Sequence, residues 1–270
     1  MTVLMVEDLD VFLGRSPVVH VDHLELVAGE VITVVGGAGA GKTTLLAGLA
    51  GLESTQGRID LAGIDVGQRR AHERARLGLA LVSTHGLQID DLVVAELLEL
   101  PRAVGRRRGR PHLGGNTAPQ PGRSWSLYDL ADRLPGLERV LHVTLAEVGA
   151  WERVAIAIAL ALRSGAQVLL VDEPAAGLGD VSQERLRASL GAIAFTGVAV
   201  VVVTRSHSLA ASLAQRRYQL LGGQLLEGQR TDEGRPLTTM TPGPAVTDVI
   251  PGTDVTAAGL VPGTDQGRSR

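Results

Sequence analysis

The sequence predicts a mixed α/β fold built around a buried parallel sheet. The apolar run 31–35 leads into a glycine-rich turn and then a helical pattern, and the apolar run 168–171 ends in two carboxylates. Residues 198–203 form a third run of the same kind. Continuous apolar runs, as opposed to alternating ones, are typical of parallel strands that are buried on both faces.

Composition narrows the class of protein. A chain of 270 residues suits one large α/β domain or a domain with an appendage. A net charge of -3 argues against a general nucleic-acid or membrane-surface binder, and the lack of cysteine excludes disulfides and cysteine metal sites. Residues 1–10 lack the layout of a signal peptide, and no apolar run approaches about 18 residues. We therefore expect a cytoplasmic protein.

The first half of the chain alternates β-type runs with turns. Residues 57–66 are expected to form a hairpin that turns at Ala62–Gly63. The charged, alanine-rich stretch 69–77 favours a short helix. Further strands are expected at 3–6, 17–21, 24–27 and 79–82, and a further helix at 92–100.

Composition changes abruptly at Pro101. Residues 101–124 contain little to bury, so we predict a mobile insert there. Its basic run, Arg106–Arg110, could contact nucleic acid or lipid headgroups, but a solvated linker is the favoured interpretation.

Regular structure is expected again from Leu127, where a helical pattern resumes. Residues 153–162 alternate large and small apolar side chains, which indicates a strand, whereas their alanine content favours a helix. Periodicity leaves both open. A hairpin is predicted around Gly222–Gly223, and residues 228–270, rich in Thr, Pro, Gly and Asp, are predicted to be a disordered tail.

The glycine-rich turn matches G-x-x-x-x-G-K-[ST] in the strand–turn–helix context of a phosphate-binding loop. Its glycines can adopt angles closed to other residues, so successive amides can face one anion, and the next helix adds its N-terminal dipole. In such a loop the lysine reaches the β- and γ-phosphates and the following hydroxyl holds Mg²⁺. The predicted nucleotide-binding residues are Gly36, Gly37, Ala38, Gly39, Ala40, Gly41, Lys42, Thr43 and Thr44.

Lys42 is the only lysine in the chain. A sequence that otherwise uses arginine keeps a compact ammonium where a planar guanidinium would not fit. The alternative is a glycine-rich turn with a surface lysine, which the flanking strand and helix patterns disfavour. We therefore predict that the chain binds a nucleoside triphosphate.

Two acids complete the predicted site. Asp172 and Glu173 follow the buried run 168–171, and open parallel sheets bind their ligands at such strand ends. An aspartate there can hold Mg²⁺ through water, and its neighbour can polarise an attacking water. Thr43 and Asp172 are thus the candidate magnesium-binding residues, and Glu173 is the candidate catalytic base.

From residue 3 to about 227 the sequence resembles the ATP-binding subunits of ABC transporters, because a phosphate loop, a helical insert and VLLVDEP follow in that order. It is most similar to the ATPases of branched-chain amino-acid importers, in residues 71–82, 92–100, 126–140 and 172–179. The resemblance implies a P-loop NTPase domain over residues 1–227: a RecA-like core, an antiparallel β subdomain and a helical subdomain inserted at about 84–152. It also implies ATP and Mg²⁺ as cofactors, transmembrane permease partners, no nucleic acid, and a position on the inner face of the cell membrane.

In that family two subunits dimerise head to tail, and each ATP lies between one phosphate loop and the other chain's LSGGQ signature. Here the signature falls on Ala146–Ala150, where only Gly149 is retained. Glu147 replaces the serine expected at the γ-phosphate, and a carboxylate there repels phosphate. Val148 replaces a glycine, which is expected to block close backbone approach.

Other family positions also differ. Arg205 stands where the switch histidine is expected, with His207 as the alternative two residues on. Thr84 stands where the family has glutamine or glutamate. The adenine-stacking position falls on Leu13, with Phe12 beside it.

We therefore predict an ATP-binding subunit that is degenerate at these positions, hydrolyses little ATP by itself and pairs with a second, more complete ABC ATPase. One alternative is a non-transport regulatory or scaffold protein in which ATP holds a conformation. Another is a phosphotransferase, for which the sequence offers no acceptor-site or lid signal other than the insert 101–124.

Overall fold

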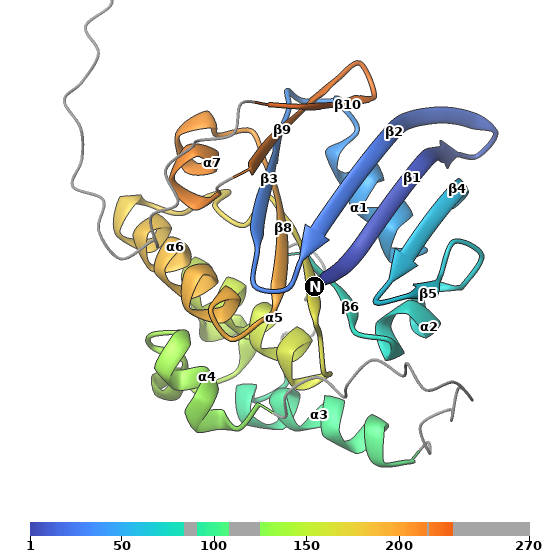
Figure 1. The fold of residues 1–270 in the computed structure, drawn as a ribbon. Helices are drawn as coiled ribbons and strands as arrows, with labels where there is room; N and C mark the ends of the chain where they lie inside the picture. The colour runs from blue at the N-terminus through green and yellow to red at the C-terminus, as the bar shows by residue number, and fades with distance from the viewer. Residues whose placement is uncertain (84–90, 108–124, 215, 229–270) are drawn as a thin grey trace, which may run out of the picture. The chain divides into compact units, whose positions relative to one another are not determined.

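The computed structural model describes residues 1–83, 91–107, 125–214 and 216–228, and only the backbone of 101–107 (Figure 1). The remainder of the predicted insert, the tail from 229 onward and Thr84 lie outside the described residues. The elements are β1 (Thr2–Leu13), β2 (Ser16–Val27), β3 (Val31–Val35), α1 (Lys42–Ala50), β4 (Ser54–Leu61), β5 (Ile64–Asp65), α2 (Ala71–Arg76), β6 (Leu79–Ser83), α3 (Val94–Arg107), α4 (Leu127–Arg133), η1 (Leu137–Val140), η2 (Leu145–Glu147), α5 (Ala150–Arg163), β7 (Val168–Asp172), α6 (Asp180–Ala194), β8 (Ala199–Thr204), α7 (His207–Leu213), β9 (Arg216–Leu221) and β10 (Gln224–Glu227).

The described strands form one sheet of ten, in the order β5-β4-β1-β2-β10-β9-β3-β8-β7-β6. Strands β9, β3, β8, β7 and β6 pair parallel with one another in that order, whereas β5, β4, β1 and β2 pair antiparallel with one another. Between these two groups, β10 pairs parallel with β2 and antiparallel with β9. The loop after β3 therefore lies beside the ends of β8 and β9, since Val35 pairs with Thr204 and with Gln219. This arrangement confirms the predicted α/β fold with a parallel sheet.

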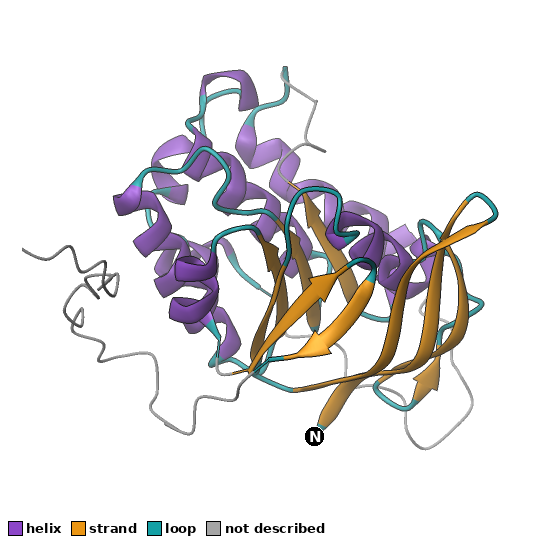
Figure 2. Cartoon of the chain, turned by 90° about the horizontal axis from the view of Figure 1, so that it is seen from above, coloured by secondary structure: helices purple, strands orange, loops and turns teal. Residues whose placement is uncertain are grey.

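Both faces of the parallel strands are covered. On one face Val201 and Val203 of β8 share a core with α1 and the antiparallel strands, and on the other Val200 and Val202 share a core with α5 and α6. Figure 2 shows most of the helices at the left and top of the view, with further helix beside the long strands that curve on the right. All five residues of β3 and all six of β8 are buried, which explains why their sequences lack alternation.

The ambiguous stretch 153–162 is helical and lies within α5. Its alternation is misleading because this helix is buried on nearly every side, so no polar face imposes a helical period. Arg163 ends the helix, where its guanidinium donates to the carbonyl oxygens of Leu98 and Trp125 and contacts the Glu99 carboxylate. This buried arginine ties α5 to α3.

Two details differ from the sequence prediction. The early β-type runs join into two long strands, β1 and β2, which pair along most of their length. Helix α3 continues past Pro101 to Arg107, into the predicted insert, since its alanine and arginine residues sustain a helix. The hairpins at Ala62–Gly63 and Gly222–Gly223 are formed as predicted, with positive φ at all four turn residues.

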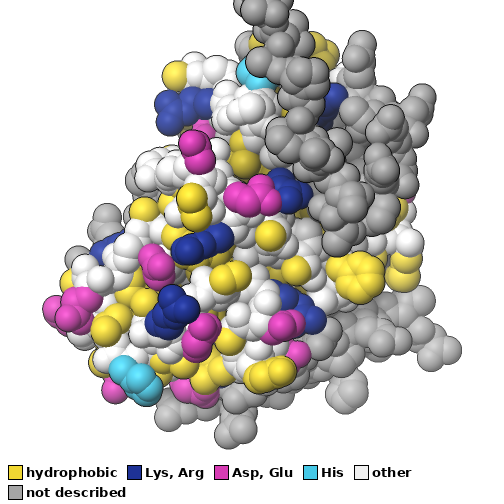
Figure 3. Space-filling model, turned by 90° about the vertical axis from the view of Figure 1, so that its left-hand side faces the viewer, with side chains coloured by type: hydrophobic (Ala, Val, Ile, Leu, Met, Phe, Trp, Pro, Cys, Tyr) yellow, Lys and Arg dark blue, Asp and Glu magenta, His cyan; other side chains and the backbone are white. Residues whose placement is uncertain are grey.

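The surface over α4 and α6 is mixed in character. Basic, acidic and hydrophobic side chains are interspersed on this face (Figure 3). Its most exposed hydrophobic side chains include Tyr128 and Val181. Among the helices described, none is both long enough and apolar enough to span a bilayer.

Candidate nucleotide-binding site

The loop between β3 and α1 requires glycine at two positions. Gly41 caps α1 with a φ of 100°, and a Cβ there would lie 2.6 Å from Cγ2 of Val19. At Gly36 a Cβ would lie 2.8 Å from the carbonyl oxygen of Leu220. Gly41 adopts left-handed backbone angles, and the backbone of Gly36 lies close to β9, so neither position tolerates a side chain.

The N-terminus of α1 is open to an anion. Within residues 41–50, all of them described, the N-cap Gly41 makes no side-chain cap and the first turn contains no acidic residue. The helix itself therefore supplies no side chain that compensates its dipole or bonds its first amide groups. This is the local geometry of a phosphate-binding helix terminus.

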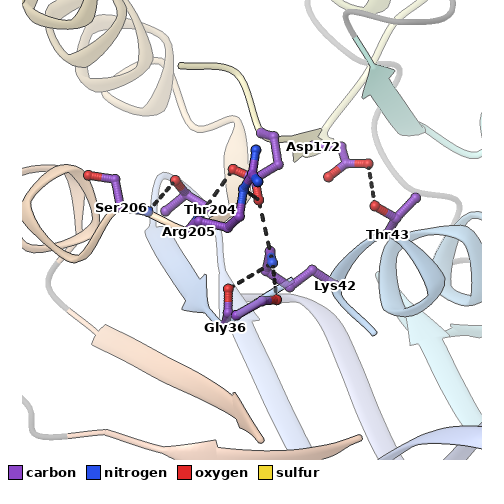
Figure 4. Close-up of polar contacts among 9 residues, drawn as sticks. Gly36, Lys42, Thr43, Asp172, Thr204, Arg205 and Ser206 are labelled. Carbon is purple, nitrogen blue, oxygen red and sulfur yellow. Dashed lines mark hydrogen bonds and ion pairs between the residues drawn. The ribbon is translucent and has the colours of Figure 1, made fainter. Parts of the chain in front are cut away.

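Lys42 begins this helix, and its side chain turns back over the loop (Figure 4). Its ammonium donates to the carbonyl oxygens of Gly36 at 2.8 Å and Gly37 at 2.9 Å. It also lies 3.4 Å from Oε1 of Glu173. With 7% of the residue exposed, this cation is held in place above the glycine-rich turn.

Thr43 and Asp172 meet although 129 positions separate them, because β7 ends beside the start of α1. The threonine hydroxyl donates to Oδ2 of Asp172 at 2.9 Å. The other carboxylate oxygen, Oδ1, is buried and has no hydrogen-bond partner in the described part of the chain. Two adjacent oxygen donors, one of them unsatisfied, fit a hard cation such as Mg²⁺ that completes its shell with water and phosphate oxygens.

Glu173 lies between two cations. Its Oε1 is 3.4 Å from Nζ of Lys42 and also 3.4 Å from Nε of Arg205, while Oε2 accepts the backbone N–H of Arg205 at 3.1 Å. The backbone of Glu173 has a φ of 43°, unusual for a residue other than glycine. Such strain persists only where surrounding contacts hold the residue, as the bond from its N–H to the Val203 carbonyl does here.

The residues at the expected signature position, Ala146–Ala150, run from the short turn η2 into the start of α5. Glu147 ends the short turn η2, and its Oε2 accepts from both the backbone N–H and the hydroxyl of Thr144 at 2.8 Å. These bonds, the backbone bond first, lower the pKa of Glu147, so its carboxylate remains charged. Gly149 then caps α5.

The side chain of Val148 is buried in the core cluster that includes α5. Its expected effect on the close approach of a backbone stays a prediction. The sequence interpretation missed Thr144. The spacing Thr144-x-x-Glu147 is that of a capping box, a local signal that identifies the partner of Glu147.

The structure brings together Lys42, Thr43, Asp172 and Glu173, as the sequence predicted. It adds Arg205 to the group, and this contact supports Arg205 over His207 as the residue at the switch position, since His207 begins α7. Leu13, at the end of β1, is 47% exposed, and its role beside the adenine stays a prediction.

Residues 19–176 match the family model described as ABC transporter. The chain belongs to the ABC transporter family. The match includes the phosphate loop and both acids, and it covers more than half of the chain. The fold accordingly is that of an ABC-type P-loop NTPase, and the chain is an ATP-binding cassette.

Curated relatives have diverse names. The chain is 34% identical over 222 residues to the sulfate/thiosulfate import ATP-binding protein CysA of Brucella melitensis, covering 82% of this chain and 59% of that protein. It is 31% identical to the ribose import ATP-binding protein RbsA 1 of Rubrobacter xylanophilus, covering 84% of this chain and 44% of that one. The cassette thus spans roughly half the length of these relatives.

Solved structures show the same fold at low identity. A nucleotide-free ATP-binding cassette from an ABC transporter has a TM-score of 0.71 at 16% identity, over 86% of this chain and 93% of that one. The dimeric cassette MJ0796 has a TM-score of 0.64 at 20% identity, over 82% of this chain and 96% of that one.

Proposed function

We propose that this cassette is the ATP-binding subunit of an ABC transporter, that it binds ATP with Mg²⁺, and that it couples the nucleotide to a membrane permease at the cytoplasmic face. The observation that carries the proposal is the meeting of Lys42, Thr43, Asp172 and Glu173 at the ends of β3 and β7. The sequence resemblance favours a transporter of the branched-chain amino-acid importer type.

Each residue has a chemical role in this proposal. The loop 36–44 binds phosphate through its amide groups and the open end of α1. Lys42 neutralises charge on the β- and γ-phosphates, and Thr43 and Asp172 would hold Mg²⁺, which neutralises developing phosphate charge when bound. Glu173 is the candidate base that orients water toward the γ-phosphate.

The permease contact is proposed for an apolar groove of about 510 Å³ between α1, α2, β6 and α5. Its lining includes Ala50 at the end of α1 and Leu52, which is 61% exposed. Two elements connect this groove to the nucleotide site: α1 starts at Lys42 and ends at the groove, and Ser83 in its wall pairs with Asp172. A helical segment of the permease seated there would therefore contact elements that also reach the nucleotide site.

We further propose that this cassette works beside a more complete ATPase. The solved cassette MJ0796 is dimeric. In the head-to-tail pair that the family resemblance implies, each signature faces the other chain's nucleotide. Two copies of this chain would place the charged Glu147 near both γ-phosphates. With a complete partner, Lys42, Asp172 and Glu173 would meet an ordinary signature, while the partner's nucleotide would face Glu147.

The purified chain tests both proposals. It should bind ATP with Mg²⁺ in a calorimetric titration, stay monomeric with ATP on a sizing column and hydrolyse little. If the isolated protein shows vigorous, cooperative hydrolysis that Glu173→Gln abolishes, the need for a second ATPase is refuted. Leu52→Asp should prevent association with permease-containing membranes and leave ATP binding intact, with Val181→Asp, at an exposed position on α6, as the matched control.

A further inference from the structure

One residue of the hairpin β9–β10 lies against both ends of the phosphate loop. Leu220 is fully buried in β9, the strand that pairs with β3 (Figure 1). At the start of the loop, a Cβ at Gly36 would lie 2.8 Å from the carbonyl oxygen of Leu220 and 3.4 Å from its Cβ. At the end of the loop, a Cβ at Gly41 would lie 3.7 Å from Cδ2 of the same leucine. The loop therefore packs on this hairpin.

Strand β2 supports the same loop from its other side. A Cβ at Gly41 would lie 2.6 Å from Cγ2 of Val19, which is buried in the core beneath α1. The side chains of Val19 and Leu220 are apolar, so they restrict the shape of the loop without adding charge to the site. Interiors packed this closely resist displacement.

The turn of the hairpin is in turn held against β2. The carbonyl oxygen of Gly223 accepts the backbone N–H of His20 at 2.7 Å, and a Cβ at Gly223 would lie 2.1 Å from the carbonyl oxygen of Val18. The preceding turn residue, Gly222, also has a positive φ, but no described atom lies within 4 Å of the position of its Cβ. Close approach to β2 is thus required at Gly223 and not at Gly222.

We propose that the hairpin β9–β10 positions the phosphate loop, with Leu220 and Gly223 as positioning residues that set the affinity of the loop for a phosphate chain. A loop that is already held in shape loses little conformational freedom when it binds an anion, and preorganisation of this kind increases affinity. Displacing the hairpin releases Gly36 and Gly41 together, because Leu220 lies against both.

This inference rests on the proposed nucleotide binding and extends it. The loop contacts are common to a diphosphate and a triphosphate, so the hairpin should affect ATP and ADP by the same factor. Coupling between two sites is reciprocal, so a bound nucleotide should also stabilise the hairpin.

The first test is a calorimetric titration with Mg²⁺-ATP and Mg²⁺-ADP. Gly223→Ala forces the hairpin away from Val18 and should weaken the binding of both nucleotides by about fivefold or more. Gly222→Ala is the matched control, because it introduces the same side chain at a positive φ in the same turn without that clash. It should change either affinity by less than about twofold.

A second pair of variants separates positioning from a general loss of stability. Leu220→Ala should weaken both nucleotides by a factor similar to that of Gly223→Ala, with circular dichroism confirming that the protein is folded. Leu4→Ala is its matched control. Leu4 is equally buried in the same core but pairs with Leu26 and Leu61, and it makes none of the loop contacts described above. It should lower the melting temperature and leave both affinities unchanged.

Hydrogen exchange of the wild-type chain tests the reciprocal effect. Saturating Mg²⁺-ADP should slow the exchange of backbone amides in residues 220–225. The hairpin that turns at Ala62–Gly63 is the internal reference, and its exchange should not change.

The outcomes separate this inference from the proposed function. Wild-type affinity in a folded Gly223→Ala protein would overturn the inference, and so would equal losses in a variant and its matched control. A loss confined to ATP would also overturn it, as would equal protection of both hairpins by ADP. All of these results leave nucleotide binding by the wild-type chain in place, whereas a wild-type chain that binds neither nucleotide would overturn the proposed function together with the inference.

Discussion

Removing the Lys42 ammonium is the most informative single perturbation of the site. In Lys42→Ala the carbonyl oxygens of Gly36 and Gly37 lose the ammonium as donor, and among the described residues Glu173 keeps only Arg205 as a cationic partner. The helix terminus and the loop amides remain. The change therefore removes one positive charge from a phosphate site whose backbone is otherwise intact.

The size of the effect follows from the contacts of the ammonium. The ammonium already donates to two carbonyl oxygens, so binding a phosphate exchanges these partners and gains only the difference in free energy. One hydrogen bond to a charged group is worth about 1.5–3 kcal/mol, which corresponds to roughly a tenfold to hundredfold change in Kd. We expect ATP affinity to fall within that range.

Calorimetric titration with Mg²⁺-ATP measures the change, and circular dichroism checks that the variant is folded. Lys42→Arg is the matched control for charge. It should also bind weakly, because a planar guanidinium cannot donate to Gly36 and Gly37 from the same buried position. Wild-type ATP affinity in a folded Lys42→Ala protein would refute the assignment of this loop as the phosphate site.

Three further predictions concern stability. Arg74 is 2% exposed, and its guanidinium donates to the backbone carbonyl oxygens of Gly48, Leu49, Gly67 and Arg69. Arg74→Met should therefore lower the free energy of unfolding, measured by denaturant titration, by about 3 kcal/mol. Arg76→Met, at an exposed position of the same helix, is the control and should change it little. Thr144→Val removes the hydroxyl that bonds Glu147 and should lower the melting temperature by about 2–4 °C. Thr144→Ser keeps a hydroxyl and should largely preserve the wild-type value. An unchanged melting temperature in Thr144→Val would show that this capping box does not stabilise the fold. Hydrogen bonds to Asp10 and then to Asp22 raise the pKa of His20 above 6.5. The stabilisation from protonated His20 is fully present below pH 6.5 and is lost as the pH rises through the raised pKa. The decrease in melting temperature caused by His20→Asn should therefore be larger at about pH 5.5 than at about pH 8.5. The same decrease at both pH values would argue against this contribution of His20.

Local chemistry was enough to predict the phosphate loop. Gly41 is required locally by its φ of 100° at the start of α1, so glycine spacing and Lys42 identify the strand–turn–helix unit without knowledge of the rest of the chain. The close approach of Gly36 to Leu220 of β9, by contrast, is a tertiary contact. The hairpins at Ala62–Gly63 and Gly222–Gly223 were predictable for the same reason, because left-handed turn residues determine them locally.

Burial decided what periodicity could not. The residues of α5 carry an alternating pattern that fits a strand as well as a helix, and only its packing against the sheet and α3 makes it a helix. Val148 shows the same limit, because its burial in the core is not evident from its position in the sequence. When nearly every side of a segment faces the core, the pattern of apolar and polar residues does not reveal whether the segment is a helix or a strand.

The sequence by itself determined that this chain carries a phosphate loop, a strand that ends in Asp172 and Glu173, and an arginine at the switch position. Only the tertiary structure decided how these groups meet. The bond between Thr43 and Asp172 and the position of Glu173 between Lys42 and Arg205 depend on the order β3-β8-β7 in the sheet, which aligns three distant strand ends. That order arises from long-range packing on both faces of the sheet, for which no local stretch of the chain contains the information.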